Sequence, residues 1–137
     1  MAHQPTVPNT LLESGQTITF DEVAFTVTEQ GPGESGADAY WQVEALRAVV
    51  FSGDVFYNHM QGFLVDGHSG QWLENIARVE QQWQPEWLRY PGHGGATGPA
   101  VLAWQRAYLA VFRQAVQELA QGSKSYPTRR KPKSSSK

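Results

Sequence analysis

The segment Val49-Val50-Phe51-Ser52-Gly53-Asp54 places a run of apolar residues directly before a Gly-Asp pair. The run predicts a buried strand over residues 47–51 that ends where the glycine allows the chain to turn. Open α/β sheets usually place their chemistry where strands end, so we expect the Asp54 carboxylate at a functional edge of the sheet. The pattern therefore predicts an α/β fold in which Asp54 is a candidate site residue at the edge of the sheet.

Upstream of this segment, polar and apolar residues alternate in residues 17–20 and 23–28. Two half-buried strands in a hairpin are expected, and the apolar residues expected to face one core are Ile18, Phe20, Val23, Phe25 and Val27. Asp21-Glu22 lies between the strands and is not a favoured two-residue turn, so the turn type stays open. The glycines of residues 31–36 predict a loop, and residues 39–43 read as a third strand.

Downstream, the apolar residues recur at helical spacing. Ser69 is the expected N-cap of a helix that ends before Pro85, and a short strand is expected over residues 87–90. A second helix is predicted from Pro99 to Gln121, followed by Gly122 as a stop. The expected buried stripes are Trp72, Leu73, Ile76, Val79 and Trp83 in the first helix, and Leu102, Leu109, Phe112, Val116 and Leu119 in the second.

The composition fits one domain with an appendage. The chain has 137 residues, no cysteine and a formal net charge of -2. Residues 1–122 hold 13 acidic and five basic side chains, a balance of -8, whereas residues 123–137 hold six basic ones and none acidic. We expect an irregular segment over 1–14, a folded domain over 15–122 and a disordered basic tail over 123–137.

Several classes of protein are excluded or disfavoured by these counts. The lack of cysteine excludes a disulfide scaffold, a Cys-ligated zinc module and a thiol nucleophile. The sequence shows no signal or membrane segment, so a cytoplasmic location without membrane contact is expected. The basic cluster of the tail is compatible with phosphate contacts, but the acidic body repels phosphate and disfavours nucleic acid as a partner.

Three loops that follow predicted strands carry the candidate chemistry, at Glu34, Asp54 and His93. Carboxylates and imidazoles are the ligands that divalent Zn, Mn or Fe accept without thiolates. Alternative readings remain open at each position: a solvated Glu34, a turn-capping Asp54 and an ordinary loop histidine at His93. The other candidates, His59 and His68, are interpreted as structural or surface residues.

The order of these features resembles the C-terminal half of the metallo-β-lactamase-fold hydrolases. It consists of the strand that ends in Gly53-Asp54, an amphipathic helix, the loop Tyr90-Pro91-Gly92-His93-Gly94 and a last helix. The resemblance covers residues 8–121 and implies half of an αββα sandwich, with a mixed sheet and two main helices. It also implies that Asp54 matches the aspartate that bridges two metal ions, and that His93 matches a ligand of the second metal.

Two departures from the family pattern limit what the resemblance implies. The signature His-x-His-x-Asp-His is absent, and Gly31-Pro32-Gly33-Glu34 stands where the family carries a Pro-Gly-His loop. Glu34 then takes the place of that histidine as a carboxylate ligand. The implied function is a metal-dependent hydrolase that is truncated and has incomplete activity on its own. The first candidate for its divalent metal is Zn, with Mn, Fe or no bound metal as the alternatives. Its implied substrate is a small-molecule ester, thioester, lactone or amide.

A non-catalytic interaction module is the alternative function. Half of a two-sheet sandwich leaves an inner sheet face uncovered, which would expose Phe20, Phe25, Trp41 and residues 48–51. An uncovered apolar sheet face favours association. The expected partner is a second copy of the chain, giving a homodimer, or a separate N-terminal half.

Overall fold

The computed structural model describes residues 7–8 and 10–121, so the predicted tail over 123–137 lies outside the described residues. The elements in chain order are β1 (Thr17–Phe20), β2 (Val23–Gly31), β3 (Asp38–Glu44), β4 (Ala48–Tyr57), α1 (Ser69–Gln82), β5 (Leu88–His93) and α2 (Ala100–Ala120). Neither helix within these residues has the length and apolar character needed to span a membrane.

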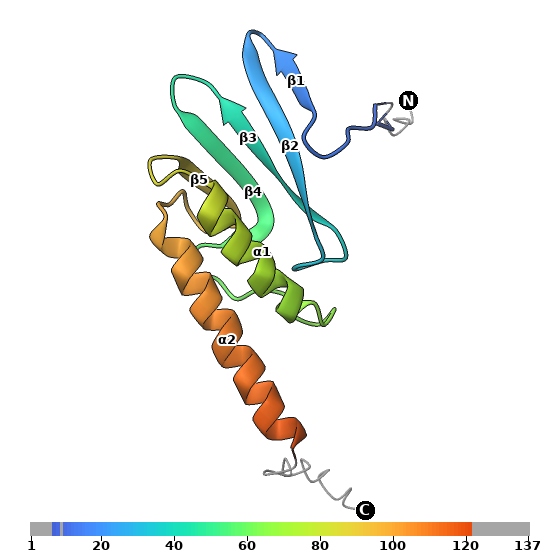
Figure 1. Ribbon diagram of the computed structural model, residues 1–137, viewed down its shortest axis with the longest axis vertical. Helices are drawn as coiled ribbons and strands as arrows, with labels where there is room; N and C mark the ends of the chain where they lie inside the picture. The colour runs from blue at the N-terminus through green and yellow to red at the C-terminus, as the bar shows by residue number, and fades with distance from the viewer. Residues whose placement is uncertain (1–6, 9, 122–137) are drawn as a thin grey trace, which may run out of the picture.

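The strands form one mixed sheet in the order β1-β2-β3-β4-β5. Strands β1 to β4 pair antiparallel as a meander, and β5 pairs parallel to β4 after the chain has crossed over through α1. Figure 1 shows both helices on the same side of the sheet. This arrangement confirms the predicted α/β class, with a mixed sheet and two main helices.

The core lies between the helices and the face of the sheet that carries Tyr40 and Val50. Trp72 of α1 is fully buried there, and its indole Nε1 donates a hydrogen bond to the Val55 carbonyl at 2.6 Å. The ring of Trp83 packs edge-on against Tyr40 with the centroids 5.0 Å apart. Because the Trp72 indole is hydrogen-bonded as well as buried, it fixes α1 against β4 in one position.

The turn between β1 and β2 resolves a point that the sequence left open. Asp21 and Glu22 both have positive φ angles, of 45° and 67°. A two-residue hairpin needs this geometry in its type I′ form, because its twist matches the twist of the flanking strands. Strand pairing therefore holds two residues in a conformation that neither favours.

Strand β4 is longer than predicted. Its expected end at Phe51 is wrong, because the strand continues to Tyr57 with register shifts on both sides of Gly53. Gly53 has a φ of +50°, which lets the strand bend without ending. The expectation of a wholly buried run is also wrong, since Val50 is fully buried but the Phe51 side chain is 45% exposed on the opposite face.

Two helix predictions need correction as well. Val116 and Leu119 are exposed although they belong to the predicted stripe of α2, because the C-terminal part of this helix runs beyond the sheet (Figure 1). The N-cap of α1 is His68 and not Ser69. Ser69 is the first helical residue, and its hydroxyl accepts a hydrogen bond from Arg113 of α2 at 3.1 Å.

Candidate functional site

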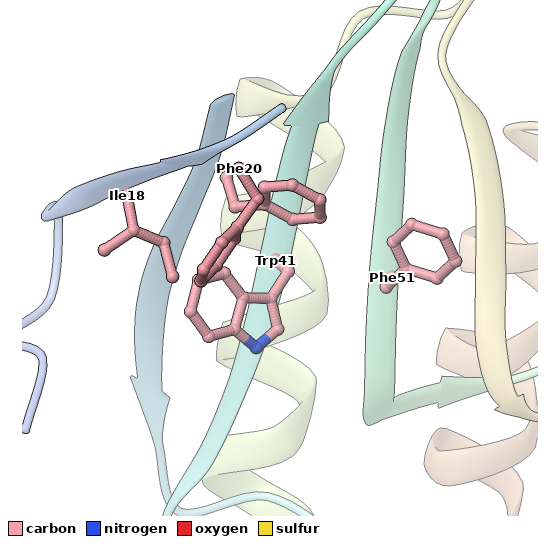
Figure 2. A pocket seen from close by; sticks show the side chains of 5 residues that line it. Ile18, Phe20, Trp41 and Phe51 are labelled. Atoms are coloured by element: carbon pink, nitrogen blue, oxygen red, sulfur yellow. The ribbon is translucent and has the colours of Figure 1, made fainter. Parts of the chain in front are cut away.

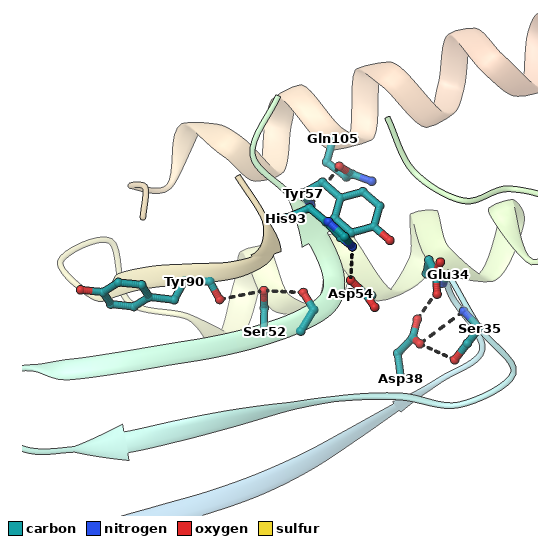
Figure 3. Close-up of polar contacts among 10 residues, drawn as sticks. Glu34, Ser35, Asp38, Ser52, Asp54, Tyr57, Tyr90, His93 and Gln105 are labelled. Atoms are coloured by element: carbon teal, nitrogen blue, oxygen red, sulfur yellow. Dashed lines mark hydrogen bonds and ion pairs between the residues drawn. The ribbon is translucent and has the colours of Figure 1, made fainter. Parts of the chain in front are cut away.

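The C-terminal parts of the parallel strands β4 and β5 bring Asp54 and His93 together. The register places Gly53 opposite Pro91 and Tyr57 opposite His93. As a result, His93 Nε2 lies 3.5 Å from Asp54 Oδ1, with the two side chains 58% and 41% exposed (Figure 3). Two of the three predicted site residues therefore meet at a solvent-accessible edge of the sheet.

A close approach of the backbone next to His93 makes this pairing possible. A Cβ atom on Gly92 would lie 2.5 Å from Asp54 Oδ1 and 2.9 Å from the carbonyl carbon of Gly53. Real Cβ contacts are not this short, so only glycine fits between the two strands. Gly92 is therefore required for a steric reason: a larger residue at this position would collide with the Asp54 carboxylate of the site.

The loop after His93 is fixed by Asn58, the residue that follows β4. The Asn58 amide donates to the His93 carbonyl at 2.9 Å, and the Asn58 side chain donates to the Gly95 carbonyl at 3.0 Å. Gly94 has a φ of +89° and packs against the Asn58 backbone. Two hydrogen bonds and a glycine turn therefore set the direction from which the imidazole reaches Asp54.

Glu34 lies in a loop that Asp38 organises. The buried Asp38 carboxylate accepts hydrogen bonds from the Glu34 amide at 2.7 Å and from the Ser35 hydroxyl at 2.6 Å (Figure 3). From the helix side, Asn75 of α1 donates to the Pro32 carbonyl at 2.8 Å. Sequence reasoning missed the roles of Asp38 and Asn75. An aspartate that closes a Gly- and Ser-rich loop is nevertheless a recognisable turn signal.

Tyr57 connects Glu34 with the Asp54–His93 pair. Its ring packs edge-on against His93 with the centroids 4.7 Å apart, and its backbone amide donates to Gln105 Oε1 at 3.3 Å. Its phenol interacts with the carboxylates of Glu34 and Asp54. No sequence motif marked Tyr57, because its role depends on side chains from β5 and from the loop after β2.

The carboxylates make this corner of the molecule electronegative. Burial raises the pKa of Glu34, and the charge of Asp54 raises it further, against the opposing effect of the Tyr57 hydrogen bond. Burial and the same two carboxylates raise the pKa of Tyr57 above its ordinary value. Tyr57 is therefore a neutral hydrogen-bond donor at physiological pH, and Glu34 is in electrostatic contact with Asp54.

The remaining described histidines do not join this cluster. His59 is exposed in the loop after β4, where its ring lies 4.7 Å from that of Trp104, and His68 caps α1. Within residues 7–8 and 10–121, no group of three His, Cys, Asp or Glu residues is arranged to hold a metal ion. In particular, Glu34 does not complete a three-ligand group with the Asp54–His93 pair.

The donor set fits a divalent metal in kind but not in number. A carboxylate and an imidazole 3.5 Å apart are suitable ligands for Zn, Mn or Fe. Zinc sites in proteins, however, take at least three protein ligands. The described residues alone therefore do not fit a complete metal centre.

Comparisons with known proteins support the fold alone. No protein-family profile matches the sequence, and no curated protein sequence matches it. Solved structures do match. A metallo-β-lactamase from Pontibacter korlensis superposes with a TM-score of 0.65 at 16% identity, over 77% of this chain and 50% of its own.

Two further structures agree with this match. A β-lactamase domain protein from Burkholderia ambifaria gives a TM-score of 0.59 at 23% identity, over 85% of this chain and 37% of its own. The DIM-1 metallo-β-lactamase superposes with a TM-score of 0.58 at 16% identity, over 72% of this chain and 47% of its own. This chain spans half or less of the length of these structures. Its fold is therefore that of a partial metallo-β-lactamase domain.

Proposed function

We propose that this chain is one half of a metal-dependent hydrolase of the metallo-β-lactamase fold. The observation that supports this most is the approach of His93 Nε2 to Asp54 Oδ1, 3.5 Å apart in the C-terminal parts of adjacent parallel strands. The two side chains are exposed enough to accept an ion and donors from outside the described residues. Zn²⁺ is the first candidate, and Mn²⁺ or Fe²⁺ are alternatives.

In this proposal the chain's residues have separate roles. Asp54 and His93 are the ligands, Tyr57 orients the imidazole through its ring, and Glu34 adds negative charge next to Asp54. Because two ligands hold an ion weakly, the chain alone has little hydrolase activity and depends on further donors. An ester, thioester, lactone or amide remains the proposed class of substrate.

Metal titration of the purified chain tests this proposal. We expect weak Zn²⁺ binding by calorimetry that is lost in His93→Ala and in Asp54→Asn. The matched control is His68→Ala, which removes a histidine outside the cluster and should leave binding unchanged. Less than about 0.1 equivalent of Zn, Mn or Fe after reconstitution, or equal losses in all three variants, would contradict the assignment.

A non-catalytic interaction module is a second candidate function. The observation that favours it is the apolar face of the sheet that the helices leave open. This function predicts that association persists in Asp54→Asn and His93→Ala, with no effect of added or removed metal. If chelation of metal dissociated the assembly, an interaction module that associates without metal would be ruled out.

A further inference from the structure

The side of the sheet opposite the helices is apolar across its whole width. One row of cross-strand partners runs over all five strands, and it consists of Ile18, Phe25, Val43, Val49 and Leu88. A second row runs over β2 to β5, and it consists of Val27, Trp41, Phe51 and Tyr90. Because direct cross-strand partners point to the same side, these side chains form one surface, which we call the open face.

The hairpin of β1 and β2 has its only apolar side on the open face. On the helix side, the row between the two described above begins with Thr17, Thr26 and Gln42. The Thr17 and Thr26 hydroxyls hydrogen-bond to one another at 2.8 Å. The hairpin therefore contributes polar residues to the side that carries the helices and apolar residues to the side that no described element covers. Such a pattern is expected when a partner covers the open face.

The open face has both projecting and hollow regions. Phe20 is 62% exposed at the β1 edge, and Phe51 stacks on Tyr90 with the ring centroids 5.2 Å apart. Between them is a hollow of about 310 Å³, lined by Ile18, Phe20, Phe25, Trp41 and Phe51 (Figure 2). The face is thus concave toward β1 and β2 and carries a projecting aromatic pair on β4 and β5.

We propose that a second copy of the chain covers the open face, with a two-fold axis parallel to β3, the central strand. Such an axis places β1 and β2 of one copy over β5 and β4 of the other. The Phe51–Tyr90 pair of each copy then faces the hollowed side of its partner. An isologous contact of this kind satisfies both copies at once and closes without leaving a further face.

The size of the open face is sufficient for such a dimer. Five strands spaced about 4.8 Å apart, each about seven residues long, give a flat area of roughly 500 Å² per copy. Two copies bury about 1,000 Å² before side-chain relief is counted, which reaches the lower bound for a specific interface. Two aligned sheets also pack with a separation of about 10 Å and with their inner side chains interdigitated. The hollow and the projecting aromatic pair of the open face suit this kind of packing. The proposal is independent of metal binding.

Light scattering after size exclusion tests the dimer in the 137-residue chain. At high micromolar concentration the expected mass is twice that of the 15.2 kDa chain. Phe51→Glu and Phe20→Glu place a charge on the open face at already exposed positions, and each should weaken the dimer at least about tenfold. Circular dichroism checks that both variants remain folded.

The control variant is Val111→Glu, which charges an exposed apolar residue on α2, where Val111 is 67% exposed. It should remain dimeric. A wild-type monomer, or a dimer broken by Val111→Glu and not by Phe51→Glu, overturns the proposal. A broad distribution of larger aggregates overturns it too, because the two-fold contact allows only two copies.

Cross-linking tests the direction of the axis. Ile18 and Leu88 belong to the same row, so the axis along β3 places Ile18 of one copy opposite Leu88 of the other. The chain has no cysteine, so Ile18→Cys with Leu88→Cys offers a clean pair. A short bis-maleimide should link the double variant into dimers and leave each single variant unlinked. Linkage of either single variant contradicts this arrangement. Within one copy the two positions are about 19 Å apart, beyond its reach.

Discussion

At the residue scale, the candidate site depends on short contacts between backbone and carboxylate. The approach of His93 to Asp54 follows two local patterns, Gly-Asp near a strand and Pro-Gly-His-Gly before a helix, whereas their role as metal ligands stays a prediction. Tyr57 and Asp38 were not, since their roles rest on contacts made only when β4, β5 and the loop after β2 come together. The role of Gly92 was hidden for the same reason, because the Asp54 carboxylate that it accommodates is on another strand.

Gly92→Ala tests how tightly this contact is packed. The added Cβ would meet Asp54 Oδ1 at 2.5 Å and the Gly53 carbonyl carbon at 2.9 Å, and the backbone of Gly53 has little room to yield. We expect a loss of about 1–3 kcal/mol in the free energy of unfolding, measured with urea. Gly95→Ala is the control, because a Cβ there has no atom within 4 Å. Equal stability of the two variants would show that the strands separate easily.

Glu34→Gln tests the electrostatics of the site in metal-free protein. Since the folded state raises the pKa of Glu34 above 4.5, charged Glu34 lowers the free energy of unfolding at neutral pH. The glutamine variant should therefore be more stable than wild type at pH above the raised pKa. The difference should disappear as the pH falls below 4.5, where both side chains are neutral. Urea unfolding across this range measures it.

The control for this pH series is Glu44→Gln, at the opposite end of β3 from the Glu34 loop. That carboxylate is exposed and accepts a hydrogen bond from Gln42. A stability gain for Glu34→Gln that persists unchanged at low pH would contradict the electrostatic cause.

At the element scale, periodicity predicted every strand and both helices, but not all their ends. The alternation in β1 and β2 is local, so both strands were readable. The expectation that their apolar residues face the core is wrong, because Ile18, Phe25 and Val27 lie on the open face. The continuation of β4 beyond Phe51 was not, because Gly53 reads as a stop in the sequence yet bends the strand without ending it. The exposed end of α2 was missed because an apolar stripe does not reveal how far the neighbouring sheet extends.

The connection between α1 and the Glu34 loop gives a prediction at this scale. Asn75 is almost fully buried in α1 and donates to the Pro32 carbonyl at 2.8 Å. Asn75→Ala leaves that carbonyl without this donor, so we expect a loss of about 1–3 kcal/mol in unfolding free energy. The loop should also become more sensitive to proteases. Gln81→Ala, an exposed change in the same helix, is the control and should leave both measurements unchanged.

At the scale of the whole molecule, the helices cover one side of the sheet and leave the other apolar. The resemblance led us to expect an uncovered face exposing Phe20, Phe25, Trp41 and residues 48–51, and the structure has the helices on one side only (Figure 1). Phe20 and Phe51 are exposed as expected, but Phe25 and Trp41 are half-buried and Val50 is buried on the helix side. The hollow between these side chains was not predictable, because it depends on the register that joins strands β1 to β4. Identities of 16–23% to the matched structures leave the fold as the firm conclusion.

Association through the open face links stability to protein concentration. If folding and pairing are coupled, each tenfold rise in concentration adds about 1.4 kcal/mol to the stability of the dimer. For two chains of 137 residues this shifts the unfolding midpoint by about 2 °C per tenfold. Calorimetry over two decades of concentration should show this rise for wild type and for Val111→Glu. Phe51→Glu, whose dimer is at least tenfold weaker, should unfold about 2 °C or more below wild type at each concentration. A constant midpoint for wild type, with light scattering that reports a dimer, would mean that the folded chain is stable before it pairs. The open face would then add contact without being required for folding.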